Sequence, residues 1–233
     1  MKQIRPRACR PGAAAALITA CIFAASPALA DSIEIVGDGS NSTEGLGSFS
    51  GLLSYEADPF ATIGLLTVEL TNTTAPDVGG YITGFLFNIA STDADASATL
   101  LGDPPPTHPF EQCTGNGLNG EPYGNPFDSG AALGGEFLGG GDPTGGIAVG
   151  ETGVFAFEVQ ADDAADLTAL NFLEGGPYDF NFLVRFRGFA NEGSDKVPAV
   201  VVPLPAPMLM GGAGLLGVFV AARRRRGLLK TTG

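Results

Sequence analysis

Hydrophobic and polar residues alternate along several short stretches of this chain, and turn residues separate the stretches. Alternation places successive side chains on opposite faces of a β-strand. The sequence DFNFLVRFRGF at residues 179–189 puts Phe182, Val184 and Phe186 on one face and Arg185 and Arg187 on the other. We therefore expect a half-buried strand with a solvated face here. In all, the pattern predicts strands at 32–36, 48–55, 62–71, 81–90, 98–101, 153–160, 179–189 and 197–202.

Two stretches depart from simple alternation. In TIGLLTVELTN, the hydrophobic pattern changes phase between Leu65 and Leu66. A β-bulge after Gly64 would produce this change, and so would a strand buried on both faces. Residues 161–173 begin with aspartates that favour a helix N-terminus, and we expect one or two helical turns there. Short strands with little helix predict an all-β fold, an antiparallel β-sandwich of jelly-roll or immunoglobulin-like type.

Residues 102–152 form an insertion that is rich in Gly, Pro and Asn. Loops of this length are uncommon inside a compact domain, so the insertion is either a functional excursion or a poorly ordered segment. Its apolar residues argue against complete disorder. They are Phe110, Leu118, Phe127, Leu133, Phe137 and Leu138.

The first 30 residues have the three parts of a secretory signal peptide. Four basic residues come first, an apolar stretch at 13–25 follows, and SPALA precedes Asp31. The apolar stretch is shorter than the roughly 20 residues that a membrane-spanning helix needs. We therefore expect cleavage after Ala30, between Ala30 and Asp31.

Charge is distributed very unevenly along the chain. Residues 31–206 contain all 25 Asp and Glu residues but only Arg185, Arg187 and Lys196 as basic residues, a net charge of −22. Nucleic acid and anionic lipid would be repelled by such a surface, which excludes both as partners. Divalent cations are the expected counterions.

Few residues suit catalysis or a transition metal. His108 is the only histidine and lies between prolines, and we see no nucleophile motif to accompany it. Cys9 and Cys21 fall in the signal peptide, so Cys113 is the one cysteine of the exported chain and is interpreted as a loop cysteine. Zinc needs about four Cys or His ligands and is not expected.

Oxygen ligands for calcium are more plentiful. Asp93 and Asp95 in DADAS, and the sequence GDGSNSTE at 37–44, place carboxylates and hydroxyls close together, although neither follows the EF-hand pattern. Solvated turn residues are the alternative.

Glycoside hydrolysis requires only two carboxylates at a suitable separation, so the sequence leaves this activity open. Asn41 and Asn72 lie in glycosylation sequons.

The C-terminal segment has a different character from the rest. Residues 204–222 carry no charge and are long enough to span a bilayer, and Arg223, Arg224, Arg225 and Arg226 follow directly. Arginines beside a span stop transfer and stay on the cytoplasmic side. We therefore expect residues 31–201 outside the membrane, one transmembrane helix at 204–222, and a cytoplasmic tail at 227–233.

This segment resembles the VPLPA variant of the PEP-CTERM sorting signal. The resemblance covers residues 202–226: the motif Val202, Pro203, Leu204, Pro205 and Ala206, the apolar helix, and the arginine cluster. It implies that a membrane-embedded exosortase recognises the motif, cuts there and releases or transfers the protein to the cell surface. It also implies a Gram-negative bacterium that makes extracellular polysaccharide, with the inner membrane as an intermediate location.

The stretches LTVELTNTT, ITGFLFNIA and LVRFRGFANEGSDKVP resemble ectodomains of the same sorting class. The resemblance implies a β-sandwich and assigns no activity. We expect an exported, acidic surface or biofilm-matrix protein with a structural or adhesive role and no catalysis or cofactor. A calcium- or polysaccharide-binding module is the first alternative, and an extracellular glycan hydrolase is the second.

Overall fold

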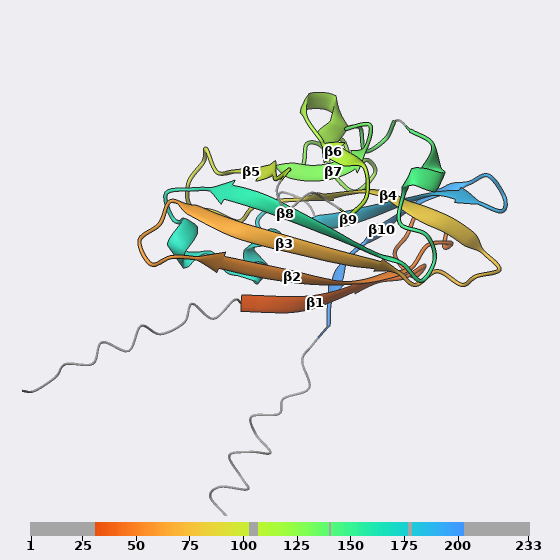
Figure 1. The fold of residues 1–233 in the computed structure, drawn as a ribbon, viewed down its shortest axis with the longest axis horizontal. Coiled ribbons are helices and arrows are strands. Elements are labelled where there is room, and N and C mark those ends of the chain that lie inside the picture. Colours follow the sequence, from red (N-terminus) through yellow and green to blue (C-terminus); the bar gives the residue numbers. More distant parts are fainter. Residues whose placement is uncertain (1–30, 103–106, 140, 177–178, 203–233) are drawn as a thin grey trace, which may run out of the picture.

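The computed structural model describes residues 31–102, 107–139, 141–176 and 179–202, and these form strands joined by turns and short 3-10 helices (Figure 1). The strands are β1 (Asp31–Gly37), β2 (Phe49–Ala57), β3 (Ile63–Asn72), β4 (Gly79–Phe87), β5 (Ser97–Leu100), β6 (Phe110–Gln112), β7 (Ser129–Leu133), β8 (Thr152–Gln160), β9 (Phe182–Phe189), β10 (Ser194–Pro198) and β11 (Val200–Val201). The 3-10 helices are η1 (Gly115–Leu118), η2 (Pro143–Gly145), η3 (Ala164–Asp166) and η4 (Ala169–Phe172).

Two antiparallel sheets pack around a common core. The first sheet has the strand order β11-β1-β2-β3-β8-β5, and the second has the order β10-β9-β4-β7-β6. The rings of Phe85 on β4 and Phe155 on β8 lie 4.9 Å apart, so side chains of the two sheets meet directly. The prediction of an all-β antiparallel fold with almost no helix is confirmed, and the arrangement is that of a β-sandwich. None of the helices among the described residues is long and apolar enough to cross a membrane.

Each of the eight stretches predicted as strands contains a strand. The last of them, 197–202, differs in detail: β10 belongs to the second sheet and β11 to the first, so the chain changes sheets at Ala199. The change occurs because β10 pairs with β9, whereas Val200 and Val201 pair with β1. β6 and β7 lie inside the Gly-rich insertion and were not predicted.

Neither interpretation of the phase change in β3 is found: there is no β-bulge after Gly64, and β3 is not buried on both faces, because every second residue is partly or fully exposed. β3 pairs with β2 and with β8 in continuous register through Gly64, Leu65 and Leu66. Glycine is needed at position 64 for another reason, because a Cβ there would lie 2.1 Å from the hydroxyl of Tyr55. Leu65 interrupts the alternation because it lies half-exposed on the outer face of the sheet. A register shift occurs instead on β4, between Ile82 and Gly84.

The stretch at 161–173 forms η3 and η4, each about one turn long, as expected of one or two helical turns. In η4 the capping residue is Thr168, and its backbone N–H donates to the Asn171 side chain at 2.8 Å. Phe172 then packs its ring 5.2 Å from that of Tyr55 on β2. The two turns therefore close one end of the core.

The insertion covers part of the outer face of the second sheet, so the solvated face expected for 179–189 is found only in part: Arg185 and Arg187 are partly exposed. Leu183 of β9 and Leu86 of β4 are buried there against Phe127 and Phe137 of the insertion. Arg185 is only partly exposed because the segment around Phe137 lies over it. None of the described segments covers the outer face of the first sheet in this way, and Figure 1 shows β1, β2, β3 and β8 side by side across it.

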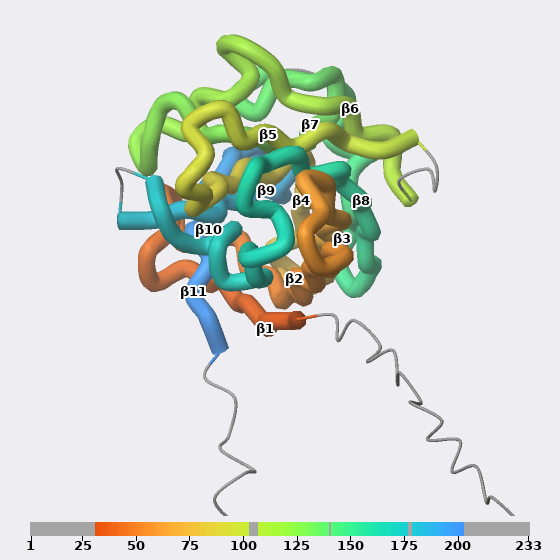
Figure 2. Tube along the Cα trace, turned by 90° about the vertical axis from the view of Figure 1, so that its left-hand side faces the viewer, coloured from red at the N-terminus to blue at the C-terminus, as the bar shows by residue number. Residues whose placement is uncertain are grey.

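The two ends of the described fold lie at the same edge of the first sheet (Figure 2). β1 begins at Asp31, and its carboxylate accepts a hydrogen bond from the Ala169 N–H at 3.0 Å. At the other end, the Val202 N–H donates to the Glu34 carbonyl of β1 at 2.9 Å. Both ends are thus held by hydrogen bonds to the sheet or to the turns beside it.

Candidate functional site

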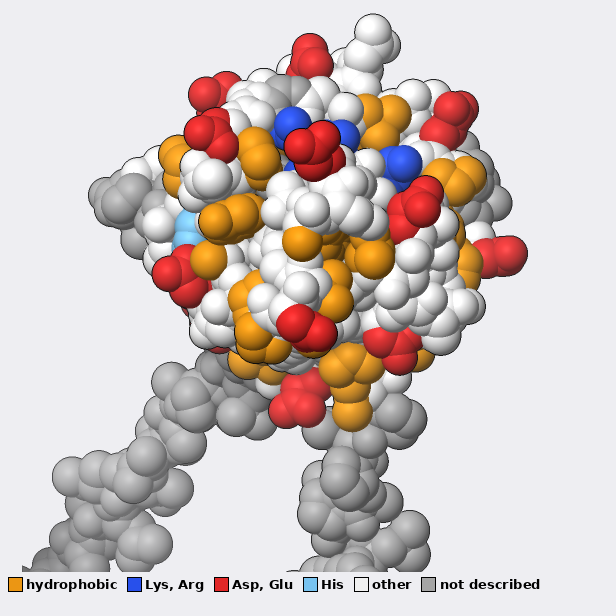
Figure 3. All heavy atoms as spheres, turned by 90° about the vertical axis from the view of Figure 1, so that its right-hand side faces the viewer, with side chains coloured by type: hydrophobic (Ala, Val, Ile, Leu, Met, Phe, Trp, Pro, Cys, Tyr) orange, Lys and Arg blue, Asp and Glu red, His pale blue; other side chains and the backbone are white. Residues whose placement is uncertain are grey.

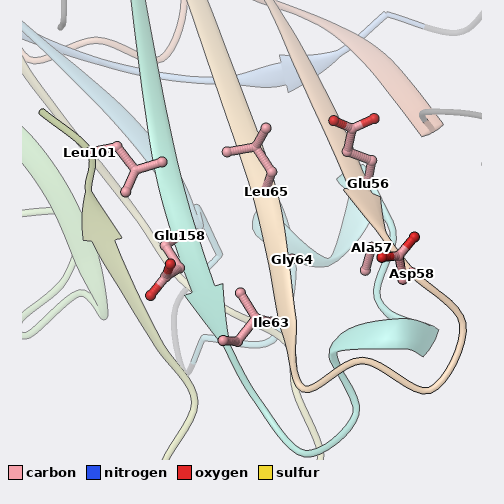
Figure 4. A pocket seen from close by; sticks show the side chains of 8 residues that line it. All are labelled: Glu56, Ala57, Asp58, Ile63, Gly64, Leu65, Leu101 and Glu158. Carbon is pink, nitrogen blue, oxygen red and sulfur yellow. The ribbon is translucent and has the colours of Figure 1, made fainter. Parts of the chain in front are cut away.

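A shallow hollow of about 400 Å³ lies on the outer face of the first sheet, where β2 ends and β3 begins. Its lining combines carboxylates with apolar side chains and includes no Lys, Arg or His (Figure 4). The lining residues are Glu56, Ala57, Asp58, Ile63, Gly64, Leu65, Leu101 and Glu158. Alternation explains the set, because Glu56, Leu65 and Glu158 all point away from the core.

Strand register fixes the distance between the two glutamates of this hollow. Glu56 pairs with Leu65, and Leu65 pairs with Glu158, so the glutamates are separated by one intervening strand. Their Cα atoms are therefore about 10 Å apart, since adjacent strands lie about 5 Å apart. Figure 4 shows the Leu65 side chain between them. This arrangement offers apolar contact flanked by negative charge, which suits binding of a ligand.

Asp93, one of the two calcium candidates, is occupied by hydrogen bonds from the backbone. One carboxylate oxygen accepts the Asp95 N–H at 2.9 Å, and the other accepts the Asp162 N–H at 2.9 Å. Asp95 itself is exposed. The part of the chain that the structure describes contains no group of three or more His, Cys, Asp or Glu side chains placed to hold a metal ion.

The sequence GDGSNSTE, the other calcium candidate, leads into a loop that wraps a buried carboxylate. Within it, Asp38 accepts the Ser40 N–H at 2.8 Å and remains exposed. The loop then folds over Asp195 of β10, which is fully buried. Four groups donate to Asp195: the Thr43 hydroxyl at 2.9 Å and the N–H groups of Glu44 at 2.9 Å, Leu46 at 2.7 Å and Gly47 at 2.9 Å.

These four donors decide the ionisation of Asp195. Burial alone would raise the pKa of its carboxyl, because a charge is poorly solvated in the interior. The N–H groups of Gly47, Leu46 and Glu44 and the Thr43 hydroxyl stabilise the carboxylate, and the pKa lies below its ordinary value. Asp195 is thus a structural anion that fixes the loop to the second sheet. Sequence reasoning did not single it out, since its four donors lie about 150 residues away.

Arg185 and Arg187 hold the insertion against the second sheet. The Arg185 guanidinium donates to the carbonyls of Phe137 and Gly139, the latter at 2.9 Å. Arg187 donates to the carbonyls of Gly139 at 3.3 Å and Gly141 at 3.1 Å. Burial, and to a smaller degree the neighbouring charge of Arg187, lower the pKa of Arg185 to about 10. Two of the three Lys and Arg residues in the described part of the chain therefore have a structural role.

His108 lies at the start of the insertion and contacts its other end. Its Nδ1 is 3.1 Å from the Thr107 hydroxyl, and its Nε2 is 3.8 Å from a Glu151 carboxylate oxygen. The Thr107 hydroxyl in turn accepts the Val154 N–H at 2.8 Å. The two ends of the insertion are joined by these contacts.

Cys113 belongs to the insertion and is buried in the cluster that includes Leu86 and Phe137, with 2% of its surface exposed. Burial raises the pKa of its thiol to about 12, although the Phe137 N–H favours the thiolate. A reactive cysteine needs an accessible thiolate, and Cys113 has neither the access nor the ionisation. It lies in the loop between β6 and η1, as expected of a loop cysteine, but it is buried and packs in the core.

This burial predicts a slow reaction of Cys113 with thiol reagents. The test uses a full chain that carries Cys9→Ser and Cys21→Ser. We expect Ellman's reagent to label Cys113 at least about 100-fold more slowly in the folded chain than in the urea-unfolded chain, because labelling of the folded chain requires local opening. An exposed reference is Ser40→Cys in a Cys113→Ala background, which should react fast in both states. Equal rates for folded Cys113 and this reference would contradict the buried position.

The two sequon asparagines differ in environment. Asn41 is exposed, whereas Asn72 is fully buried at the end of β3. The Asn72 side chain donates to the carbonyls of Gly80 at 3.1 Å and Ile147 at 3.0 Å, and it accepts the Thr74 N–H at 3.1 Å. All of its polar capacity is used inside the fold, so Asn72 has a structural role in the folded protein.

Most of the predicted sorting signal lies outside the described residues. Val202 is described and is partly exposed at the edge of the first sheet. Pro203, Leu204, Pro205 and Ala206, the apolar segment at 204–222, the arginines at 223–226 and the tail at 227–233 are outside the described part, and so is Ala30 on the other side of the predicted cleavage site. Comparisons with protein-family models, curated proteins and solved structures found no match to this chain.

Proposed function

We propose that the chain is an exported surface or extracellular-matrix protein, sorted through its C-terminal segment by an exosortase-type enzyme of the inner membrane. One observation carries the proposal: the motif VPLPA at 202–206 opens an uncharged stretch that reaches residue 222, and four arginines follow at 223–226. The stretch is long enough for a membrane span, and the arginines place the acidic body on the outer side.

The ends of the described fold support this proposal. Asp31 begins β1 and is itself used by the fold, so a cut after Ala30 would leave the sheet complete. Val202 follows β11 at the sheet edge, and its N–H is bound by Glu34. The proposed motif therefore starts just after the last described strand, and a cut at or after it would leave every described strand intact.

The acidic surface favours a structural or adhesive role of the body outside the cell. A net charge of −22 for residues 31–206 keeps such a protein soluble and away from anionic lipid once it is released. Within this proposal the sandwich is of jelly-roll or immunoglobulin-like type, and residues 204–222 form the transmembrane helix of the unprocessed chain. No catalytic step is assigned to it.

The proposal predicts the C-terminus of the mature protein. In a Gram-negative bacterium that carries an exosortase, we expect mass spectrometry of the surface protein to find no peptide beyond about Ala206. Scrambling residues 202–206 should retain the tail and leave the protein in the inner membrane. Scrambling residues 227–233 is the matched control and should leave processing unchanged. Mature surface protein that keeps residues 207–226 would refute the proposal.

A further inference from the structure

Phe60 occupies a turn position that normally requires glycine. The turn between β2 and β3 is closed by a hydrogen bond from the Ala61 N–H to the Asp58 carbonyl at 3.0 Å. Pro59 precedes Phe60, and the φ of Phe60 is 69°. Proline followed by a residue with positive φ is the pattern of a type II turn, where glycine or asparagine is usual in the second of these positions. A bulky side chain costs free energy in this conformation.

No packing contact with the described residues offsets this cost for the Phe60 side chain. It is 99% exposed, whereas the other large apolar side chains recorded as exposed among the described residues are at most 50% exposed. The neighbouring apolar residue on β3, Ile63, is the 50% case and lines the hollow described above. An aromatic ring that strains its own turn and packs against none of the described residues points to a contact with a partner.

Carboxylates line two hollows that adjoin this turn. A second hollow, of about 350 Å³, lies between the turn and η3 and is lined by Pro59, Phe60, Ala61, Asp162, Ala165 and Asp166. Asp162 and Asp166 are exposed, and neither side chain takes part in the hydrogen bonds of the described residues. On the other side of the turn are Glu56, Asp58 and Glu158 of the first hollow.

Positive charge is remote from this end of the molecule. The turn projects at the left end of Figure 1, whereas Lys and Arg side chains are visible in the view of the opposite end (Figure 3). Arg185, Arg187 and Lys196 are the Lys and Arg residues of the described part of the chain, and they belong to β9 and β10 of the second sheet. Anionic lipid is therefore a poor occupant for an apolar side chain that shares its hollow with two carboxylates.

We propose that the β2–β3 turn is a docking site for a positively charged segment of another protein, with a Lys or Arg side chain over the Phe60 ring and beside Asp162 and Asp166. An aromatic face attracts a cation, and two carboxylates at its edge add attraction of the same sign. The exposed ring supplies apolar area as well. This site does not depend on the sorting signal and would operate on the released body.

The test uses the full-length chain in dodecyl maltoside and a fluorescein-labelled octalysine peptide as the probe, measured by anisotropy at 50 mM salt. Phe60→Ser should weaken binding about two- to fivefold, the size of one exposed cation–π contact. Phe60→Trp should bind at least as tightly as the natural chain, because the indole is the better cation–π partner. Asp162→Asn with Asp166→Asn should weaken binding further than Phe60→Ser.

The matched controls remove the same features elsewhere on the first sheet. Glu34→Gln with Glu69→Gln deletes two carboxylates, and Val36→Ser deletes an exposed apolar side chain that is 42% exposed. Neither should change octalysine binding by as much as the turn variants. Equal losses for the two carboxylate pairs, or no loss with Phe60→Ser, would show non-specific attraction and overturn the proposal. Binding of maltoheptaose at this turn without competition by octalysine would overturn it as well.

Discussion

Asp195→Asn should destabilise the protein by about 2–4 kcal/mol. The carboxylate is fully buried and accepts hydrogen bonds from one hydroxyl and three backbone N–H groups. An amide group has one oxygen to accept with, and its NH₂ would face donors, so several of these groups would lose their partner. Hydrogen bonds to a charged group contribute roughly 1.5–3 kcal/mol each, and buried donors without a partner are costly.

Thermal unfolding of the full chain measures this effect. For a folded body of this size each kcal/mol corresponds to roughly 2–4 °C, so the Tm should fall by about 5–15 °C. Asp38→Asn is the matched control, because it removes one carboxylate at the start of the same loop from an exposed position. It should leave the Tm close to that of the natural chain. Equal Tm values for Asp195→Asn and Asp38→Asn would contradict the structural role.

The same carboxylate gives the stability a defined pH dependence. The pKa of Asp195 is lower in the folded protein than in an unfolded chain. The contribution of Asp195 to the free energy of unfolding is therefore complete at pH values above its pKa in the unfolded chain. It is lost as the pH falls through its pKa in the folded protein. Titration of the Tm toward acid should show this loss in the natural chain, and Asp195→Asn should show a smaller dependence over that interval.

Strand positions could be predicted because buried and exposed residues alternate within a strand. In β3, Leu66, Val68 and Leu70 are buried and Thr67 and Glu69 are not, so alternation in the sequence corresponds to the two faces of the sheet. The same applies to the core face of β9. Local patterning reports burial wherever one face meets the core and the other meets water.

The strands within residues 102–152 could not be predicted because they are short and because β7 consists mostly of small residues. β7 has the sequence SGAAL and is buried throughout, and Gly130 lies so close to β4 that a Cβ would be 2.3 Å from the Phe85 carbonyl. Small residues there signal a close approach of two backbones, but in a sequence they are indistinguishable from turn residues. The partial cover of the outer face of β9 was missed because Phe137, whose carbonyl accepts from Arg185, lies 48 residues away in the chain.

The candidate sites differ in the same way. The proposed sorting signal is contiguous, so its order of parts is visible in the sequence. The surroundings of Phe60 are not contiguous in the sequence. Asp58 is two residues from Phe60, but Asp162 and Asp166 come from the connection after β8. Only the fold brings them together. The one local signal was the turn sequence DPFA, in which an aromatic residue follows proline.

Phe85→Ala should have an effect of at least the size expected for Asp195→Asn, because Phe85 joins the two sheets. Its ring lies 4.9 Å from Phe155 and 5.9 Å from Phe157 on β8, and 5.9 Å from Phe182 on β9. The side chain is fully buried, and its removal would leave a cavity among rings that cannot all move inward. Phe→Ala changes at such positions cost about 3–5 kcal/mol, which corresponds here to a Tm lower by roughly 6–20 °C.

Phe60→Ala is the control that separates packing from the loss of an aromatic ring. The same atoms are removed from a side chain that is 99% exposed, so no cavity forms and the Tm should not fall. Phe60→Gly should raise the Tm slightly, since glycine adopts the positive φ of the turn without strain. If Phe85→Ala and Phe60→Ala shift the Tm equally, the two sheets are not held together by this ring. Unequal shifts of the expected size would show that the ring of Phe85 stabilises the fold and that the ring of Phe60 does not.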